Sequence, residues 1–112
     1  MPRREKGHEL TNKELTDSIC KSNLNMMEQF YKYICSSGYS NGTVSQYYSD
    51  IRIFFVWNYK CNKNKLYKNI TANQFKKFYY WMVEENGCNQ KRISRIGSVL
   101  KHFDSFAENI YE

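Results

Sequence analysis

The sequence contains few of the residues that interrupt regular secondary structure. Of its 112 residues, five are glycine and one is proline, and that proline is residue 2. A domain built only of β-strands needs turn-forming residues about every 8–12 positions. The shortage of proline and glycine therefore argues against a β-sandwich or barrel and favours long, uninterrupted helices.

Long apolar runs are also absent. No run of about 18 apolar residues is present to span a membrane, and the polar N-terminus lacks the apolar segment of a secretion signal. We therefore expect a cytosolic protein that has no membrane partner. The four cysteines form no C-x-x-C pair, so free thiols are expected rather than a zinc site or a disulfide framework.

Catalytic motifs are missing as well. Neither His8 nor His102 has an acidic or nucleophilic neighbour in a recognisable catalytic motif, and no glycine-rich phosphate loop occurs. Glu84 and Glu85 are adjacent, so on a helix their side chains would point about 100° apart, which does not suit a paired acid and base. We expect no catalytic residue, no metal and no cofactor in this chain.

Apolar and basic residues are plentiful. Hydrophobic residues make up 41% of the chain and aromatic residues 17%, enough for the core of one domain of this length. The formal net charge is +6, and residues 60–101 hold ten basic but only two acidic side chains. Such a concentration of charge indicates a polyanionic partner, most commonly nucleic acid. A solvated lysine surface is the alternative.

Apolar residues recur at three- and four-residue spacing, which predicts helices over 23–37, 41–59 and 90–108. Another helix is expected to start after Thr71, because Thr71 and Gln74 fit the T-x-x-Q pattern of a capping box. A polar link over 60–69 would join the second and third helices.

Residues 1–21 have mixed charge and weak periodicity, so we expect a flexible N-terminal arm there and the helical domain over 22–112. The pattern of the first helical pair recurs in the second with an offset of 49 residues: Gly38 corresponds to Gly87, and Ser40 corresponds to Asn89. These glycines suit helix ends and these polar residues suit N-caps. The repeat predicts an all-α fold, with four main helices arranged as two packed helical hairpins.

The expected core faces follow the apolar stripes of these helices. They contain Met26, Met27, Phe30, Ile34, Cys35, Val44, Tyr47, Tyr48, Ile51, Phe54, Phe55, Phe75, Phe78, Tyr79, Met82, Val83, Ile93, Ile96, Leu100, Phe103 and Phe106 or Ala107.

Polar and basic residues gather at the starts of the second and fourth helices. A helix N-terminus presents free N–H groups and partial positive charge, which suit phosphate, and Arg or Gln side chains can reach base edges. Each group also has an alternative interpretation. The short side chains could simply cap the helices, the basic side chains could form a solvated face, and the tyrosine could pack in the core. The candidate DNA-binding residues are Ser40, Asn41, Thr43, Gln46, Tyr47, Asn89, Lys91, Arg92, Arg95 and Lys101.

Residues 40–57 read S-x-x-T-V-x-x-Y-x-x-D-I-x-x-F-x-x-W. This stretch resembles the second helix of the core-binding, SAM-like N-terminal domain of tyrosine recombinases, the phage integrase family. Residues 87–106 resemble the last helices of that domain, with Arg95, Ser98, Leu100, Lys101 and Phe103 at positions of the family pattern R-x-x-S-x-L-R-x-F. The resemblance covers about residues 23–107.

The resemblance implies an all-helical, non-catalytic domain that grips double-stranded DNA at a core recombination site through its second and fourth helices. In that family a second domain, C-terminal to this one, carries the tyrosine nucleophile, and the whole protein acts as a tetramer on DNA. We therefore expect the chain to be an excised domain, with its catalytic domain missing, and a stand-alone remnant of such a recombinase is the alternative. A helical protein-interaction module whose basic face meets an acidic partner is the alternative function.

Overall fold

The computed structural model describes residues 16–85 and 87–111, and these residues form helices and no strand. Four α-helices and a short 3-10 helix follow one another, which confirms the all-α prediction. Their bounds are α3 Lys21–Ser36, α4 Asn41–Cys61, η1 Tyr67–Asn69, α5 Ala72–Glu84 and α6 Gln90–Tyr111.

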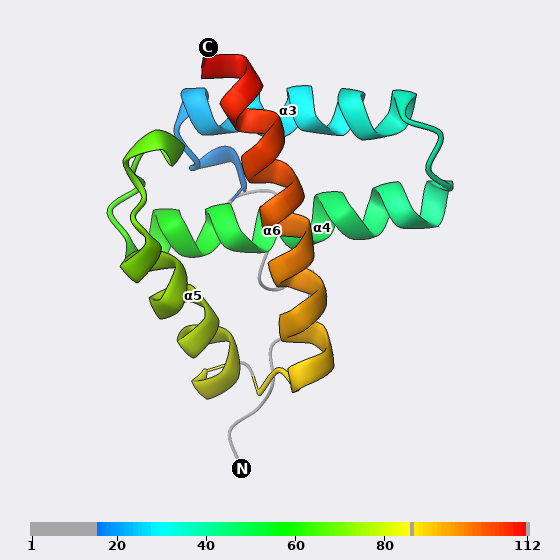
Figure 1. Ribbon diagram of the computed structural model, residues 1–112. Helices are drawn as coiled ribbons and strands as arrows, with labels where there is room; N and C mark the ends of the chain where they lie inside the picture. Colours follow the sequence, from blue (N-terminus) through cyan, green and yellow to red (C-terminus); the bar gives the residue numbers. More distant parts are fainter. Residues whose placement is uncertain (1–15, 86, 112) are drawn as a thin grey trace.

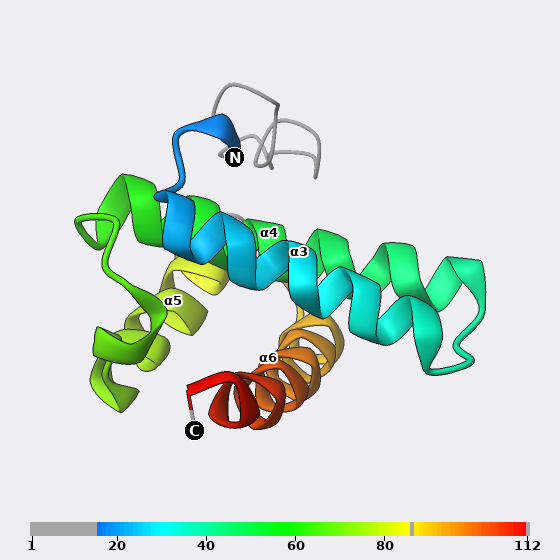
Figure 2. The same cartoon turned by 90° about the horizontal axis from the view of Figure 1, so that it is seen from above.

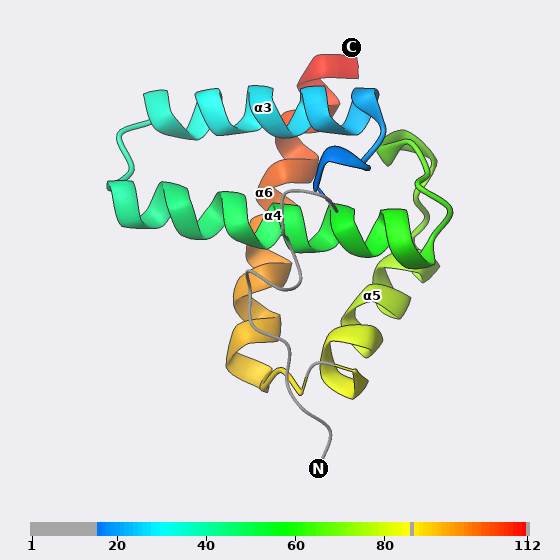
Figure 3. The same ribbon diagram turned by 180° about the vertical axis from the view of Figure 1, so that it is seen from behind.

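The helices form two layers. Helices α3 and α4 run antiparallel and side by side in one layer, and α6 crosses both of them (Figures 1 and 2). Helix α5 lies on the same side of the α3–α4 hairpin as α6, and the α5 and α6 helices diverge from each other (Figure 3). The last helix therefore crosses α4 near its middle, and this crossing positions the candidate site.

The local signals for helix ends are confirmed. The hydroxyl of Ser40 caps α4, and Thr71 and Gln74 form the reciprocal capping box of α5. Gly38 and Gly87 both have positive φ, 85° and 63°, a conformation that glycine adopts without the steric cost a Cβ would bring. These residues explain why the helix starts lie within two residues of the predicted positions.

Helix α4 is the centre of the core. From Asp50 to Asn58 it has only one residue that is not buried, so it is enclosed on nearly all sides. The Phe54 ring stacks on Phe75 of α5, and Phe30 of α3 meets Phe103 of α6, each with centroids 5.0 Å apart. Burying such rings stabilises the fold by about 1.5–3 kcal/mol each.

Three sequence predictions about the fold need correction or qualification. Two side chains expected on the core faces are exposed: Cys35 near the end of α3, and Val83, which is 45% exposed because α5 turns only Phe78 and Met82 fully inward. Ile19 is 3% exposed and belongs to the core, so the packed domain begins before residue 22. Residues 1–15 of the expected arm lie outside the described part of the chain.

The expected polar link is largely structured. Helix α4 continues to Cys61, and η1 occupies Tyr67–Asn69. Between them, Lys63 and Asn64 adopt left-handed backbone conformations with φ of 60° and 53°. The connection between α4 and α5 is therefore tightly turned, with a single 3-10 turn before α5.

Candidate nucleic-acid interface

The short polar residues at the start of α4 bond mainly to each other. The Ser40 hydroxyl accepts a hydrogen bond from the Thr43 backbone N–H at 3.2 Å and donates one to Thr43 Oγ1 at 3.0 Å. Asn41 is exposed beside them. Capping therefore explains the positions of Ser40 and Thr43, while the exposed faces of all three side chains stay open to solvent.

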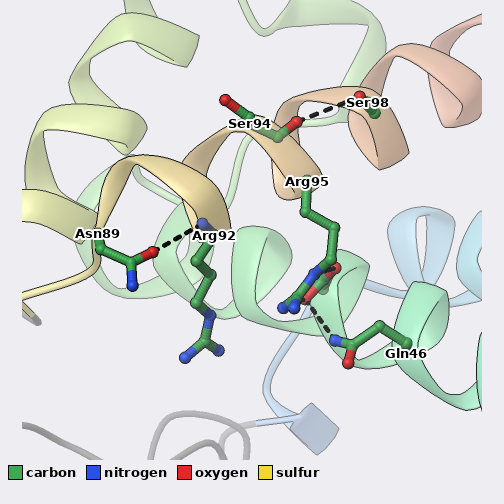
Figure 4. A network of polar contacts seen from close by, with 7 residues as sticks. Gln46, Asn89, Arg92, Ser94, Arg95 and Ser98 are labelled. Carbon is green, nitrogen blue, oxygen red and sulfur yellow. Dashed lines mark hydrogen bonds and ion pairs between the residues drawn. The ribbon is translucent and has the colours of Figure 1, made fainter.

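The start of α6 is capped in the same way. The Asn89 side-chain oxygen accepts a hydrogen bond from the Arg92 backbone N–H at 2.9 Å. This bond uses the amide oxygen of Asn89 and fixes the first turn of the helix. The side chains of Arg92 and Arg95 leave α6 on one side, whereas Ser94 and Ser98 lie on the other (Figure 4).

Gln46 of α4 and Arg95 of α6 meet on one buried carboxylate. Asp50 Oδ1 accepts from Gln46 Nε2 at 3.1 Å and from Arg95 Nη2 at 3.4 Å, and Asp50 Oδ2 accepts from Arg95 Nε at 3.3 Å. The Asp50 side chain is fully buried, whereas that of Arg95 is 43% exposed. One carboxylate thus holds two of the predicted DNA-binding side chains, from two helices, at the helix crossing. Figure 4 shows Gln46 and Arg95 pointing toward each other from the two helices.

The electrostatics at Asp50 are a balance of opposing effects. Burial raises the pKa of this carboxyl above its ordinary value of 3.8, and it outweighs the hydrogen bond and charge of Arg95, the charge of Arg92 and the hydrogen bond from Gln46. Each of those three neighbours favours the ionised form. Removing a neighbour would therefore leave a buried carboxyl even less inclined to ionise.

Arg92 and Lys91 supply charge next to this crossing. Lys91 is exposed. Arg92 is partly buried, and its Nε atom is enclosed but makes no hydrogen bond to any described residue. The remainder of the Arg92 guanidinium lies close enough for its charge to act on Asp50. The first turns of α6 therefore carry three basic side chains, and two of them, Arg92 and Arg95, act on the carboxylate that Gln46 also binds.

The other predicted residues do not join this group. The start of α4 holds Ser40, Asn41 and Thr43. At a rise of 1.5 Å per residue, Asn41, the first residue of the helix, lies about 14 Å along the helix axis from Asp50. Lys101 lines a cavity of about 620 Å³ between α5 and α6, together with Tyr79.

Tyr47 belongs to an aromatic cluster around His102. The His102 ring has centroid distances of 5.9 Å to Tyr47, 6.2 Å to Tyr39, 6.0 Å to Tyr33 and 5.7 Å to Phe30. Tyr47 is partly buried against the core, which agrees with its place on the apolar stripe of α4. Its packing role accounts for its position without a nucleic-acid contact.

Asp50 is the residue that sequence reasoning missed. It appeared in the motif but received no role. It is the only acidic residue between Glu28 and Glu84, and it lies four positions after Gln46 on the same helix. A lone carboxylate in a basic, apolar stretch is a signal of a buried counter-ion, because an unpaired buried charge is costly.

Within residues 16–85 and 87–111, no three His, Cys, Asp or Glu side chains converge where they could hold a metal ion. No helix of this described part has the length and apolar character needed to cross a bilayer. Comparison with known protein families, curated proteins and solved structures finds no match to this chain.

Proposed function

We propose that this chain is a module that binds double-stranded DNA, of the kind that serves as the core-binding domain of tyrosine recombinases, and that it has no catalytic activity of its own. The observation that carries the proposal is the meeting of Gln46 and Arg95 on Asp50. Two helices thereby present an amide and a partly exposed guanidinium at one place, and the first turn of α6 adds the basic side chains of Lys91 and Arg92.

Each side chain has a chemistry that suits one part of a duplex. Lys91 and Arg92 lie at the positively polarised N-terminus of a long helix and suit phosphate oxygens. Gln46 and Arg95 carry planar donor groups of the type that read base edges in the major groove. Asp50 limits the freedom of both groups, so less conformational entropy is lost when they bind.

The test is a titration of a short DNA duplex, followed by backbone amide shifts at about 50 and 200 mM salt. Phosphate contacts release counterions, so affinity should fall by orders of magnitude between these salt concentrations if several phosphates are bound. We expect the shifts to cluster on residues 43–50 and 89–95.

A charge-matched pair of variants sharpens the test. Arg92→Gln should weaken binding and lower the slope of log K against log salt by about 0.9, the value for one lost phosphate contact. Lys32→Gln removes the same charge from α3, outside the proposed interface, where Lys32 pairs with Glu28 at 3.5 Å, and should leave the slope unchanged. Equal effects of the two variants would show only a general charge effect and would overturn the assigned interface.

Absence of binding at the lower salt concentration would overturn the DNA proposal itself. The alternative, a protein-interaction module with an acidic partner, would then be the better account of the basic surface.

A further inference from the structure

A loop outside the proposed interface is held in shape by buried asparagines. It begins with the last turn of α4 and ends with η1, over residues 60–69. Asn23 of α3 and Asn58 of α4 each donate a side-chain hydrogen bond to the Lys65 carbonyl, both at 2.8 Å. Asn23 also accepts from the Tyr67 backbone N–H at 3.0 Å. Both asparagine side chains are fully buried.

Asn64 ties the same loop to the segment before α3. Its side chain accepts from the Cys20 backbone N–H at 3.2 Å and donates to the Ser18 carbonyl at 3.3 Å. Asn62 donates to Asn58 at 2.9 Å, and the Asn64 N–H donates to the Asn58 carbonyl at 2.8 Å. We call Asn23, Asn58, Asn62 and Asn64 the asparagine clamp.

The clamp fixes the backbone of a loop whose charged side chains face outward. Lys60, Lys63 and Lys68 are exposed, and none of them forms an ion pair with a carboxylate of the described residues. Asp104 and Glu108 line a cavity together with Lys68, so Lys60 and Lys63 are the least compensated. From Ile51 to Val83 the chain has no acidic residue at all.

We infer that this clamped loop is a second contact for the phosphate backbone of double-stranded DNA, with Lys60 and Lys63 as its binding groups. The inference rests on the proposed function. Lysine binds phosphate as a compact point charge and needs no partner of fixed shape. A clamped backbone reduces the ordering entropy that loop contacts usually cost.

The spacing along α4 allows one duplex to reach both surfaces. Asp50 and Lys60 are ten residues apart on one helix, about 15 Å along its axis. This length corresponds to between four and five base-pair steps of about 3.4 Å each. A duplex that occupies the α4–α6 crossing would therefore need to extend only a few base pairs to meet the loop.

The decisive experiment compares single lysine variants of equal charge in the DNA titration. Lys60→Gln and Lys63→Gln should each lower the salt slope by about 0.9 and weaken binding several-fold at 50 mM salt. Lys32→Gln is the control and should leave both quantities unchanged. Loop variants that bind as the control does, while Arg92→Gln still weakens binding, would overturn this inference and leave the proposed function standing.

A variant without any charge change tests the role of the clamp. Asn64→Gly keeps a residue that tolerates the left-handed backbone but removes the bonds to Ser18 and Cys20. We expect the salt slope to stay the same, affinity to fall a few-fold, and trypsin to cut faster after Lys63 and Lys65. Faster cutting with undiminished affinity would show that the clamp serves only the fold and would overturn its role in binding.

Two outcomes of the wild-type titration bear on the proposed function and on this inference together. A wild-type chain that does not bind DNA overturns the proposed function and this inference together. Binding in which amide shifts appear on residues 60–65 as well as on 89–95 supports both.

Discussion

Asp50 of α4 and Arg95 of α6 form an ion pair in which the carboxylate is fully buried and the guanidinium is 43% exposed. The pair joins two helices at their crossing, with residues 45 positions apart in the sequence. Because the carboxylate is removed from water, its compensation comes from the hydrogen bonds and charge of Arg95, the charge of Arg92 and the hydrogen bond from Gln46. Arg95 therefore has a structural task in addition to its proposed contact with DNA.

The ion pair predicts a measurable coupling in stability. Arg95→Met should destabilise the fold by about 2 kcal/mol, because it leaves a buried carboxylate with one remaining side-chain partner. Asp50→Asn combined with Arg95→Met should cost less than the sum of the two single changes, by about 1 kcal/mol or more. Urea unfolding of the four proteins measures this double-mutant cycle. Additive effects would show that the two side chains do not interact in solution.

Asp50 also predicts a pH dependence. Burial raises its pKa in the folded state above the ordinary value of 3.8, so the folded chain retains this proton at pH values where the unfolded chain has lost it. Asp50 therefore makes its full contribution to the free energy of unfolding below about pH 4. This contribution declines as the pH rises through the folded-state pKa of Asp50.

The measurement compares wild type with Asp50→Asn. The free energy of unfolding of wild type, relative to that of the variant, should increase as the pH is lowered from 7 toward 4. A difference that stays constant across this range, or one that decreases, contradicts the predicted direction.

Asn23 predicts a large effect from a neutral side chain. Asn23→Ala removes the partners of the Lys65 carbonyl and the Tyr67 N–H in a buried place, and Asn58 compensates only the carbonyl. We expect a loss of about 2–3 kcal/mol in the free energy of unfolding. Asn25→Ala, on the exposed side of the same helix, should change stability by less than about 0.5 kcal/mol.

The capping box of α5 predicts a smaller and more local effect. Thr71→Ala removes the oxygen that accepts from the Gln74 N–H at 3.3 Å and should cost about 1 kcal/mol. Asn73→Ala, exposed in the first turn of the same helix, is the matched control. Thermal or urea unfolding that gives equal values for the two variants would show that the cap adds no stability.

Features encoded by neighbouring residues were predictable from the sequence. The caps at Ser40, Thr71 and Asn89 each depend on residues three positions apart, and the stops at Gly38 and Gly87 depend on one residue. Val83 was misplaced because periodicity marks an apolar stripe but does not say how much of a short, peripheral helix the core covers. Helix α5 contacts its neighbours along a narrower face than its sequence suggests.

Features made by distant residues were not predictable in the same way. The pairing of Asp50 with Arg95 spans 45 positions, and the bonds of Asn23 and Asn64 to distant backbone groups span 42–46. No local pattern specifies which asparagines in a polar sequence are buried. The candidate residues Gln46, Arg92 and Arg95 were named from the sequence, but only the fold reveals that Asp50 organises them.

The rings around His102 give the molecule a built-in spectroscopic reporter. They come from α3, from the turn that follows it and from α4, whereas His102 itself lies on α6. Magnetic shielding by four aromatic rings should move the imidazole carbon-bound proton signals away from their usual positions. The only other histidine in the chain is His8, so these displaced signals would reveal directly, without any label, when the last helix docks on the first hairpin.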